Sequence, residues 1–159
     1  ASTATTNWNG APTSSVFNIG TGTEANTSGA NMIAYCFAAV KGYSAMGSYT
    51  GNGSSDGPFV FLNFRPRYVI IKNITTGGAN YDWVIIDSAR EPYNVTQYDL
   101  AANTSGSEAS GILSQPADLL SNGFKIRASG ANAYPTNTSG STYIYAAFAE
   151  NPFNISRAR

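Results

Sequence analysis

Three acidic residues lie close enough along the chain to be considered for acid–base chemistry: Asp82, Asp87 and Glu91. A glycosidase needs two such carboxyls on opposite sides of a cleft. Asp87 instead begins the segment Asp87-Ser-Ala-Arg90, which predicts a turn with a local ion pair, and Glu91 precedes Pro92. The chain has no histidine, which excludes Ser-His-Asp and Cys-His catalysis. We therefore predict that the protein is not an enzyme and has no catalytic residue.

The segment Asn52-Gly-Ser-Ser-Asp56-Gly partly resembles a calcium-binding loop, since it offers side-chain oxygens at alternate positions. Asn63 stands where such a loop needs its bidentate glutamate, so the pattern favours a glycine-rich turn. Histidine metal sites are also excluded. We expect no metal site, no cofactor-binding residue and no cofactor. The single cysteine, Cys36, lies inside an apolar run and is expected to be a small buried side chain.

Three tyrosines lie in segments that are expected to be loops: Tyr93, Tyr98 and Tyr134. Aromatic rings stack on the apolar faces of sugars, and the many asparagine amides can pair with sugar hydroxyls. These tyrosines are therefore candidates for surface contacts with carbohydrate or protein. The alternative is that each ring packs on the protein's own sheets.

The elements that must position these residues are short apolar runs, at residues 59–62, 68–71 and 83–86. Each run is rich in valine, isoleucine and aromatics and is bounded by Gly, Pro, Asn or Asp, which is typical of strands. The second and third do not alternate with polar residues, which predicts central strands covered on both faces. Residues 77–80 predict the hairpin loop between them.

Two side-chain expectations follow from these runs. Pro66 cannot donate to a strand ladder, so it is expected just before a strand. Trp83 and Ile85 are expected to share one core with Val69 and Ile71.

Further strands are predicted at residues 32–40 and 143–149, and Asn122-Gly123 predicts a hairpin that leads into the strand 124–127, with one wet face. In residues 32–40 the alanines favour a helix, whereas the aromatics, the bounding glycines and the length favour a strand. Residues 92–117 are expected to be a long exposed loop. Several short strands without a long helix predict an all-β fold, an antiparallel β-sandwich or jelly-roll-like barrel.

The composition predicts two regions with different roles. Residues 1–31 are mostly small and polar and are expected to be an extended N-terminal arm, and residues 32–159 are expected to be the β-sandwich domain. Charged residues make up 11% of the chain, and nine basic residues balance nine acidic ones, so nucleic acid is not an expected partner. No apolar run is long enough to predict membrane insertion.

Several short motifs, taken in order, resemble a C-terminal β domain of bacteriophage tail fibres and related virion proteins, common in phages of aquatic bacteria. The resemblance covers residues from about 33 to 159 and rests on these motifs: Tyr35-Cys-Phe-Ala, Gly42-Tyr-Ser, Gly47-Ser-Tyr-Thr-Gly-Asn-Gly, Asp56-Gly-Pro-Phe-Val, Phe64-Arg-Pro-Arg-Tyr-Val-Ile-Ile-Lys, Trp83-Val-Ile-Ile-Asp, Ala89-Arg-Glu-Pro-Tyr-Asn, Leu120-Ser-Asn-Gly-Phe-Lys and Tyr145-Ala-Ala-Phe-Ala-Glu-Asn-Pro-Phe.

The resemblance implies a non-enzymatic structural protein on the exterior of the phage virion, made in the host cytoplasm and acting in assembly and host attachment. In longer proteins, lectin-like domains often precede this domain, and none does here. A small capsid-decoration or fibre-tip module is therefore expected as an alternative to a conventional tail fibre. Implied partners are other virion proteins, a host-surface glycan or protein, and copies of itself, with a homotrimer the first expectation. Trp8 and Phe17 are expected as inter-subunit anchors. The alternative function is a carbohydrate-binding module of a secreted protein.

Overall fold

The structure is a computed structural model that describes residues 7–77, 81–110, 116–130, 133 and 135–152. Contacts between residues divide the chain into two units, Ala1–Phe37 and Ala38–Arg159. The second unit contains the strands, which are β1 (Ser44–Thr50), β2 (Phe59–Phe61), β3 (Pro66–Asn73), β4 (Val84–Asp87), β5 (Tyr98–Ala101), β6 (Ala109–Ser110), β7 (Ala117–Leu120), β8 (Gly123–Ile126) and β9 (Thr142–Ala149).

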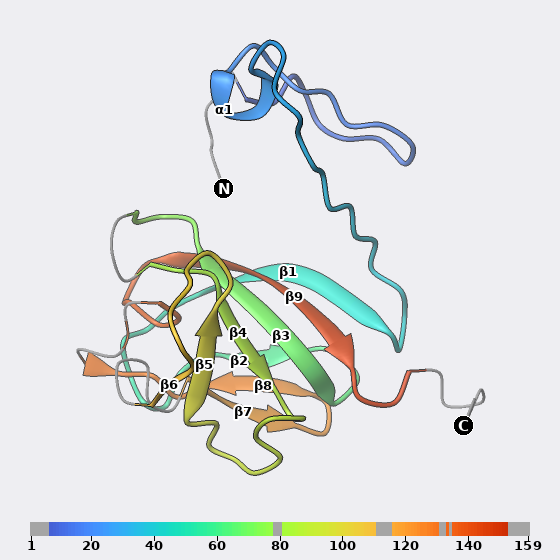
Figure 1. The fold of residues 1–159 in the computed structure, drawn as a ribbon. Coiled ribbons are helices and arrows are strands. Elements are labelled where there is room, and N and C mark those ends of the chain that lie inside the picture. Colours follow the sequence, from blue (N-terminus) through green and yellow to red (C-terminus); the bar gives the residue numbers. More distant parts are fainter. Residues whose placement is uncertain (1–6, 78–80, 111–115, 131–132, 134, 153–159) are drawn as a thin grey trace. The chain divides into compact units, whose positions relative to one another are not determined.

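These strands form two sheets that pack face to face (Figure 1). The larger sheet has the order β1-β9-β3-β4-β5-β6 and the smaller one the order β2-β8-β7, and every pairing between strands is antiparallel. The prediction of an all-β antiparallel sandwich is therefore confirmed, and the sheets do not close into a barrel. Pro66, expected just before a strand, is the first residue of β3, a position where proline is also tolerated.

The core lies between the two sheets, because alternate residues of each strand point to the same face. From β8, Phe124 is fully buried and meets Tyr49 and Tyr145 of the larger sheet edge to face, with ring centroids 6.2 and 5.4 Å away. The core residues are Val60, Leu62, Phe64, Val69, Ile71, Val84, Ile86, Ala117, Leu119, Phe124, Ile126, Ala128, Tyr143, Ala147 and Ala149.

The expectation that Trp83 and Ile85 face this core is wrong, whereas Val69 and Ile71 do face it. Val69 pairs with Ile86, and Ile71 pairs with Val84, and all four of these side chains are fully buried. Trp83 and Ile85 are only partly buried. A shift of one residue along a strand moves every side chain to the other face, and a run such as Val-Ile-Ile does not reveal which face is which.

The prediction of a strand at residues 32–40 is also wrong, since the first strand of the sandwich is β1. Residues 31–39 carry no strand pairing, and Val40 forms a single bridge with Ser44. β1 has no apolar run and contains Gly47, so its sequence signal is weak. A Cβ atom at Gly47 would lie 2.7 Å from the hydroxyl oxygen of Tyr145 on β9, so a larger residue there would require the Tyr145 ring to shift.

The hairpin predicted near Asn122 is confirmed with its turn one residue earlier. Leu120 pairs with Gly123, so Ser121 and Asn122 form the turn and Gly123 begins β8. Gly123 packs against β2, where a Cβ atom would lie 2.0 Å from the carbonyl oxygen of Val60. Along β8 the core and partly exposed side chains alternate, as predicted.

The region from 92 to 117, expected to be one exposed loop, contains β5 and β6, and Pro116 is buried. β3 and β4 pair as a hairpin, as predicted, and Gly78, Ala79 and Asn80 of its loop lie outside the described residues. No helix in the described ranges is long and apolar enough to cross a membrane.

The first unit folds back on itself where an extended arm is expected. Trp8 and Ile19 form an antiparallel bridge, and the Asn9 N–H donates to the Asn18 carbonyl at 3.0 Å. A one-turn helix, α1 (Thr23–Asn26), follows and buries none of its side chains. The Asn7 amide reaches back to the Glu24 carboxylate at 2.7 Å. Local hydrogen bonds hold this unit, because it has almost no apolar core of its own.

Candidate functional site

A hollow of about 330 Å³ lies on the loop between β4 and β5 and is a candidate site for a ligand. Its lining comes from a single stretch of nine residues, with aromatic, amide and charged side chains side by side. The lining residues are Arg90, Glu91, Pro92, Tyr93, Asn94, Val95, Gln97 and Tyr98.

Side chains of the loop itself fix its shape. One oxygen of the Glu91 carboxylate accepts hydrogen bonds from the backbone N–H groups of Gln97 and Tyr98, at 2.6 and 2.7 Å. The Asn94 amide bonds to the backbone of Leu119 on β7 twice, donating to its carbonyl at 3.0 Å and accepting from its N–H at 2.8 Å. Asn94 thereby imitates a neighbouring strand.

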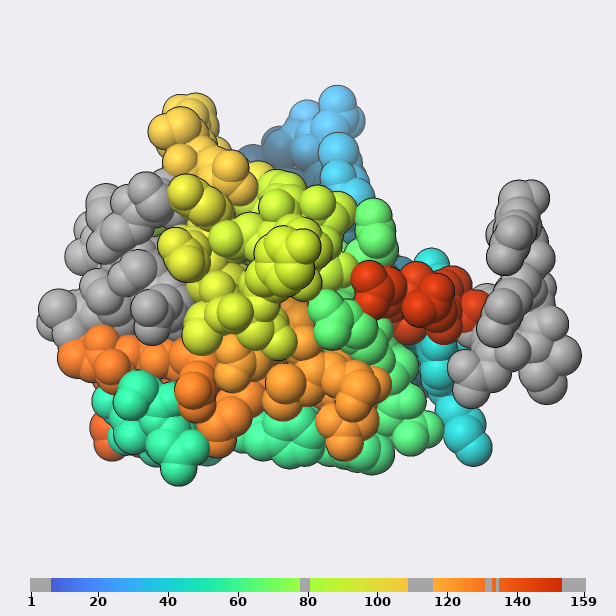
Figure 2. All heavy atoms as spheres, turned by 90° about the horizontal axis from the view of Figure 1, so that it is seen from below, coloured from blue at the N-terminus to red at the C-terminus, as the bar shows by residue number. Residues whose placement is uncertain are grey.

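Thr96 continues this pairing two residues later. Its hydroxyl donates to the Ala117 carbonyl at 2.8 Å and accepts from the Ala117 N–H at 3.3 Å, and its own N–H donates to the same carbonyl at 3.0 Å. In Figure 2 the yellow-green loop region lies directly beside the orange strands of the smaller sheet. The loop therefore covers the edge of β7 and is held at both its middle and its end.

Arg90 supports one wall of the hollow. Its guanidinium pairs with Asp87 and Glu108 and donates to the Ile85 carbonyl at 3.2 Å. Burial would raise the pKa of the Asp87 carboxyl, but hydrogen bonds from Arg90 and Ala89 and the charge of Arg90 outweigh it and hold this pKa below its usual value. The ion pair predicted for this turn is confirmed, and Asp87 remains ionised as a structural partner.

Two of the three predicted tyrosines meet at this hollow. Tyr93 is 84% exposed and Tyr98 is 40% exposed. Tyr98 is the first residue of β5, whereas the sequence places it in a loop. Tyr134 lies outside the described residues. Sequence analysis did not predict the residues that hold the loop around these rings. Glu91, Asn94 and Thr96 hold it through hydrogen bonds from side chain to backbone, which no local sequence motif indicates.

The other carboxylates considered for chemistry have structural partners as well. Asp82, which precedes β4, accepts from the Asn103 amide at 2.7 Å, whereas Glu91 follows the other end of β4. In the predicted glycine-rich turn, Asp56 pairs with Lys125 at 2.7 Å, and the buried Asn137 amide donates to the Ser54 carbonyl at 2.8 Å. The described residues contain no group of side chains that could hold a metal ion.

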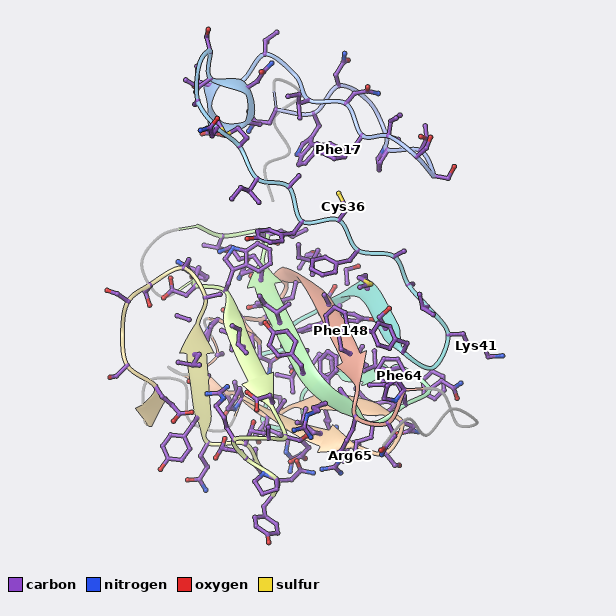
Figure 3. The ribbon with its side chains drawn as sticks, turned by 45° about the vertical axis from the view of Figure 1, so that its right-hand side comes forward. Phe17, Cys36, Lys41, Phe64, Arg65 and Phe148 are labelled. Carbon is purple, nitrogen blue, oxygen red and sulfur yellow. The ribbon has the colours of Figure 1, made fainter. Side chains whose placement is uncertain are left out.

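A second hollow, of about 460 Å³, lies near the start of β1 and contains two cationic side chains, Lys41 and Arg65. Arg65 is already paired with Glu150 at 2.7 Å. Figure 3 shows Lys41, Phe64 and Arg65 at this place. Its lining residues are Lys41, Gly42, Asn63, Phe64, Arg65, Ser121 and Asn151, and none of them offers an exposed aromatic face.

Residues 32–40, called the apolar stretch below, form the largest exposed run of hydrophobic side chains in the described chain. Ile33 is 79% exposed, Tyr35 80% and Met32 51%, and Phe37 and Val40 are exposed as well. Cys36, expected to be buried, is an exposed thiol on this stretch (Figure 3). Large side chains at 33, 35 and 37 alternate with small ones at 34, 36 and 38. This alternation is typical of a β-strand, yet residues 31–39 pair with no strand in the described chain.

Strand β1, which follows this stretch, is an edge strand of the larger sheet. The N–H of Ser44 points away from β9, since it donates to the Val40 carbonyl at 2.9 Å. Hydrogen-bonding direction alternates along a strand, so the N–H and C=O groups of Met46, Ser48 and Thr50 point to the same open side. Among the described residues none pairs with them there.

The predicted anchors Trp8 and Phe17 lie together in the first unit. Their rings meet edge to face with centroids 6.1 Å apart, and 49% of Trp8 and 40% of Phe17 remain exposed.

Comparison with known proteins identifies the family but not an activity. Residues 1–152 match the family described as "Domain of unknown function (DUF7483)". Searches of curated proteins and of solved structures found no match. Because the matched region covers nearly the whole chain, the protein belongs to the DUF7483 family.

Proposed function

We propose that this chain is a non-enzymatic structural protein on the exterior of a bacteriophage virion, a tail-fibre, fibre-tip or capsid-decoration module that assembles with copies of itself and takes part in host attachment. The exposed apolar stretch carries the proposal. Burying each large side chain of that stretch against a partner would stabilise the complex by about 1.5–3 kcal/mol. The motif resemblance supports the virion setting.

Two further features support assembly. The open edge of β1 offers backbone groups that a strand from another copy can pair with, and proteins rarely leave such an edge exposed without a use or a protection. The Trp8–Phe17 pair offers an aromatic anchor, a type of residue that often dominates binding energy. In a virion appendage these contacts close around an axis, and the proposed state is a homotrimer.

The first experiment measures the molar mass of the full chain by light scattering as its concentration rises. The proposal expects a trimer that the double variant Ile33→Ser/Tyr35→Ser converts to monomer. The control Phe59→Ser/Phe61→Ser changes two other exposed aromatics, on β2, and is expected to leave the trimer intact. A wild-type chain that stays monomeric at high concentration contradicts the proposal, and a control that dissociates equally contradicts the role of the apolar stretch.

The virion setting needs its own test. Antibodies raised against the purified chain are expected to label intact phage particles at regular positions in electron micrographs. Particles that contain the chain only inside, or not at all, would contradict it. Turnover of a polysaccharide or peptide that is lost on changing Asp82, Asp87 or Glu91 would contradict the non-enzymatic reading.

A further inference from the structure

We infer that the hollow lined by residues 90–98, the tyrosine hollow, binds a neutral carbohydrate. The inference deepens the attachment part of the proposed function, on which it rests, by naming a site and a ligand class. It is carried by two exposed aromatic rings, Tyr93 on the loop between β4 and β5 and Tyr98 at the start of β5, and by a loop that is fixed before any ligand arrives.

The loop is fixed by bonds to its interior and to β7. Glu91 clamps the N–H groups of Gln97 and Tyr98, Asn94 pairs with Leu119, and Thr96 pairs with Ala117. A ligand that binds a preformed loop does not have to order it, which removes a large part of the usual entropic cost. A hollow of about 330 Å³ is at the small end of ligand sites, the size expected for one or two sugar rings.

The exposed side chains of the hollow match the two kinds of surface on a sugar. Tyr93 and Tyr98 offer flat rings for the apolar face formed by the sugar's C–H groups, and neither ring packs on another aromatic ring in the described residues. The exposed Gln97 amide and the tyrosine hydroxyls offer donors and acceptors for sugar hydroxyls. The ring of Tyr93, which is 84% exposed, is accessible to a ligand.

The charges of the hollow select against acidic sugars. Arg90 is its only cation among the lining residues, and its guanidinium is already held by Asp87, Glu108 and the Ile85 carbonyl. The Glu91 carboxylate adds negative charge. A sialylated or phosphorylated glycan would find the one lining cation already paired and the Glu91 carboxylate repelling it, whereas a neutral hexose meets neither problem.

The test is an array of neutral oligosaccharides, ending in glucose, galactose, mannose or N-acetylglucosamine, beside the same structures with sialic acid added. The full chain is expected to bind neutral members, and titration calorimetry with the strongest of them gives the affinity. Tyr93→Ala is expected to weaken that affinity at least about tenfold with an unchanged melting temperature, because the ring touches little of the protein. Gln97→Ala is a second variant that leaves the frame intact.

Phe59→Ala, which removes an exposed ring from β2, is the matched control and is expected to bind like the wild type. Absence of binding on the array, a preference for sialylated glycans, or unchanged binding by both Tyr93→Ala and Gln97→Ala would each overturn the inference, as would a protein ligand captured by the hollow. The array reports on the hollow and light scattering reports on assembly, so one proposal can fail while the other stands.

Discussion

Two edge strands of this sandwich, β7 of the smaller sheet and β1 of the larger one, differ in whether the chain covers them. At β7, the loop before β5 covers the edge, with the Asn94 amide and the Thr96 hydroxyl taking the places of a neighbouring strand. At β1, the backbone of Met46, Ser48 and Thr50 faces outward with no partner among the described residues. The covered edge makes a rigid platform for two tyrosines, and the open edge leaves a site where another copy can pair.

This contrast bears on the two proposed kinds of recognition, that of a small ligand and that of another copy of the chain. A small ligand benefits from a preformed loop, because little ordering is needed on binding. Assembly is favoured by exposed apolar side chains and unpaired backbone groups. The apolar stretch and the open edge of β1 contribute binding free energy when a neighbouring copy covers them. The comparison predicts that changes at the two edges will have different effects on the free energy of unfolding of the single chain.

The largest effect is expected in the core that both edges share. Phe124→Ala removes a fully buried ring that links the smaller sheet to Tyr49 and Tyr145, and it should cost about 3–5 kcal/mol in chemical denaturation. Trp83→Ala is the control, and it should cost clearly less because Trp83 is only partly buried. Equal costs for the two would mean that the core is not where the two sheets meet.

The next effect is a pH dependence from Asp99, which lies on β5, just after the loop that covers β7, and is 3% exposed. Burial raises the pKa of its carboxyl to about 6, with Asp82 and Glu108 adding to the rise and Arg90 opposing it. The unfolded value is about 3.9, so the folded state holds the proton more tightly. This group therefore favours folding most at low pH, and that contribution is lost as the pH rises from about 4 to above 6.

A shift of about two pKa units corresponds to about 3 kcal/mol across that window. Asp99→Asn carries no titrating group there, so the difference in unfolding free energy between variant and wild type should grow from pH 4 to pH 7. Denaturant titrations at four pH values measure it. Parallel curves for the two proteins would contradict the prediction.

A smaller effect is expected from Thr96→Val at the covered edge. The valine keeps the shape but removes the hydroxyl that serves both the N–H and the C=O of Ala117. Leaving that buried N–H without an acceptor should cost about 1–3 kcal/mol in chemical denaturation. Thr96→Ser retains the hydroxyl and should lose much less. If valine and serine behave alike, the side chain does not substitute for a strand.

The sequence could predict what local patterns specify. The apolar runs of β2, β3 and β9, the turn before β8 and the alternation of Phe124 and Ile126 with their neighbours all follow from composition and period. The ion pair of Asp87 with Arg90 was predictable for the same reason, because the two residues are three positions apart.

What depends on distant partners was not predictable. β1 is a strand because β9 pairs with all of its residues, and residues 32–40 have strand character but lack a ladder partner. The inward face of β4 is set by its register with β3, which a Val-Ile-Ile run does not encode. At the candidate site, the tyrosines could be named from their type and loop context, whereas the Asn94 and Thr96 contacts arise only when β7 comes alongside.

The smallest effect on the single chain is expected at the open edge. Ser48→Pro removes an N–H that has no partner among the described residues, and proline is tolerated on an edge strand when its position faces solvent. At concentrations where the chain is monomeric, the unfolding free energy should change by no more than about 1 kcal/mol. The same proline blocks any strand that would pair with this edge, so it should weaken self-association in light scattering if copies join there.

Ala45→Pro provides the matched control on the same strand. Because the direction of hydrogen bonding alternates, the Ala45 N–H faces β9, where Ala45 pairs with Ala147. Proline at this position removes a ladder bond inside the sheet and should strongly destabilise the monomer. The difference in unfolding free energy between Ser48→Pro and Ala45→Pro measures whether the outer side of β1 has a partner in the single chain. Equal destabilisation by Ser48→Pro and Ala45→Pro would show that something in the single chain already covers β1, and the comparison of the two edges would then fail.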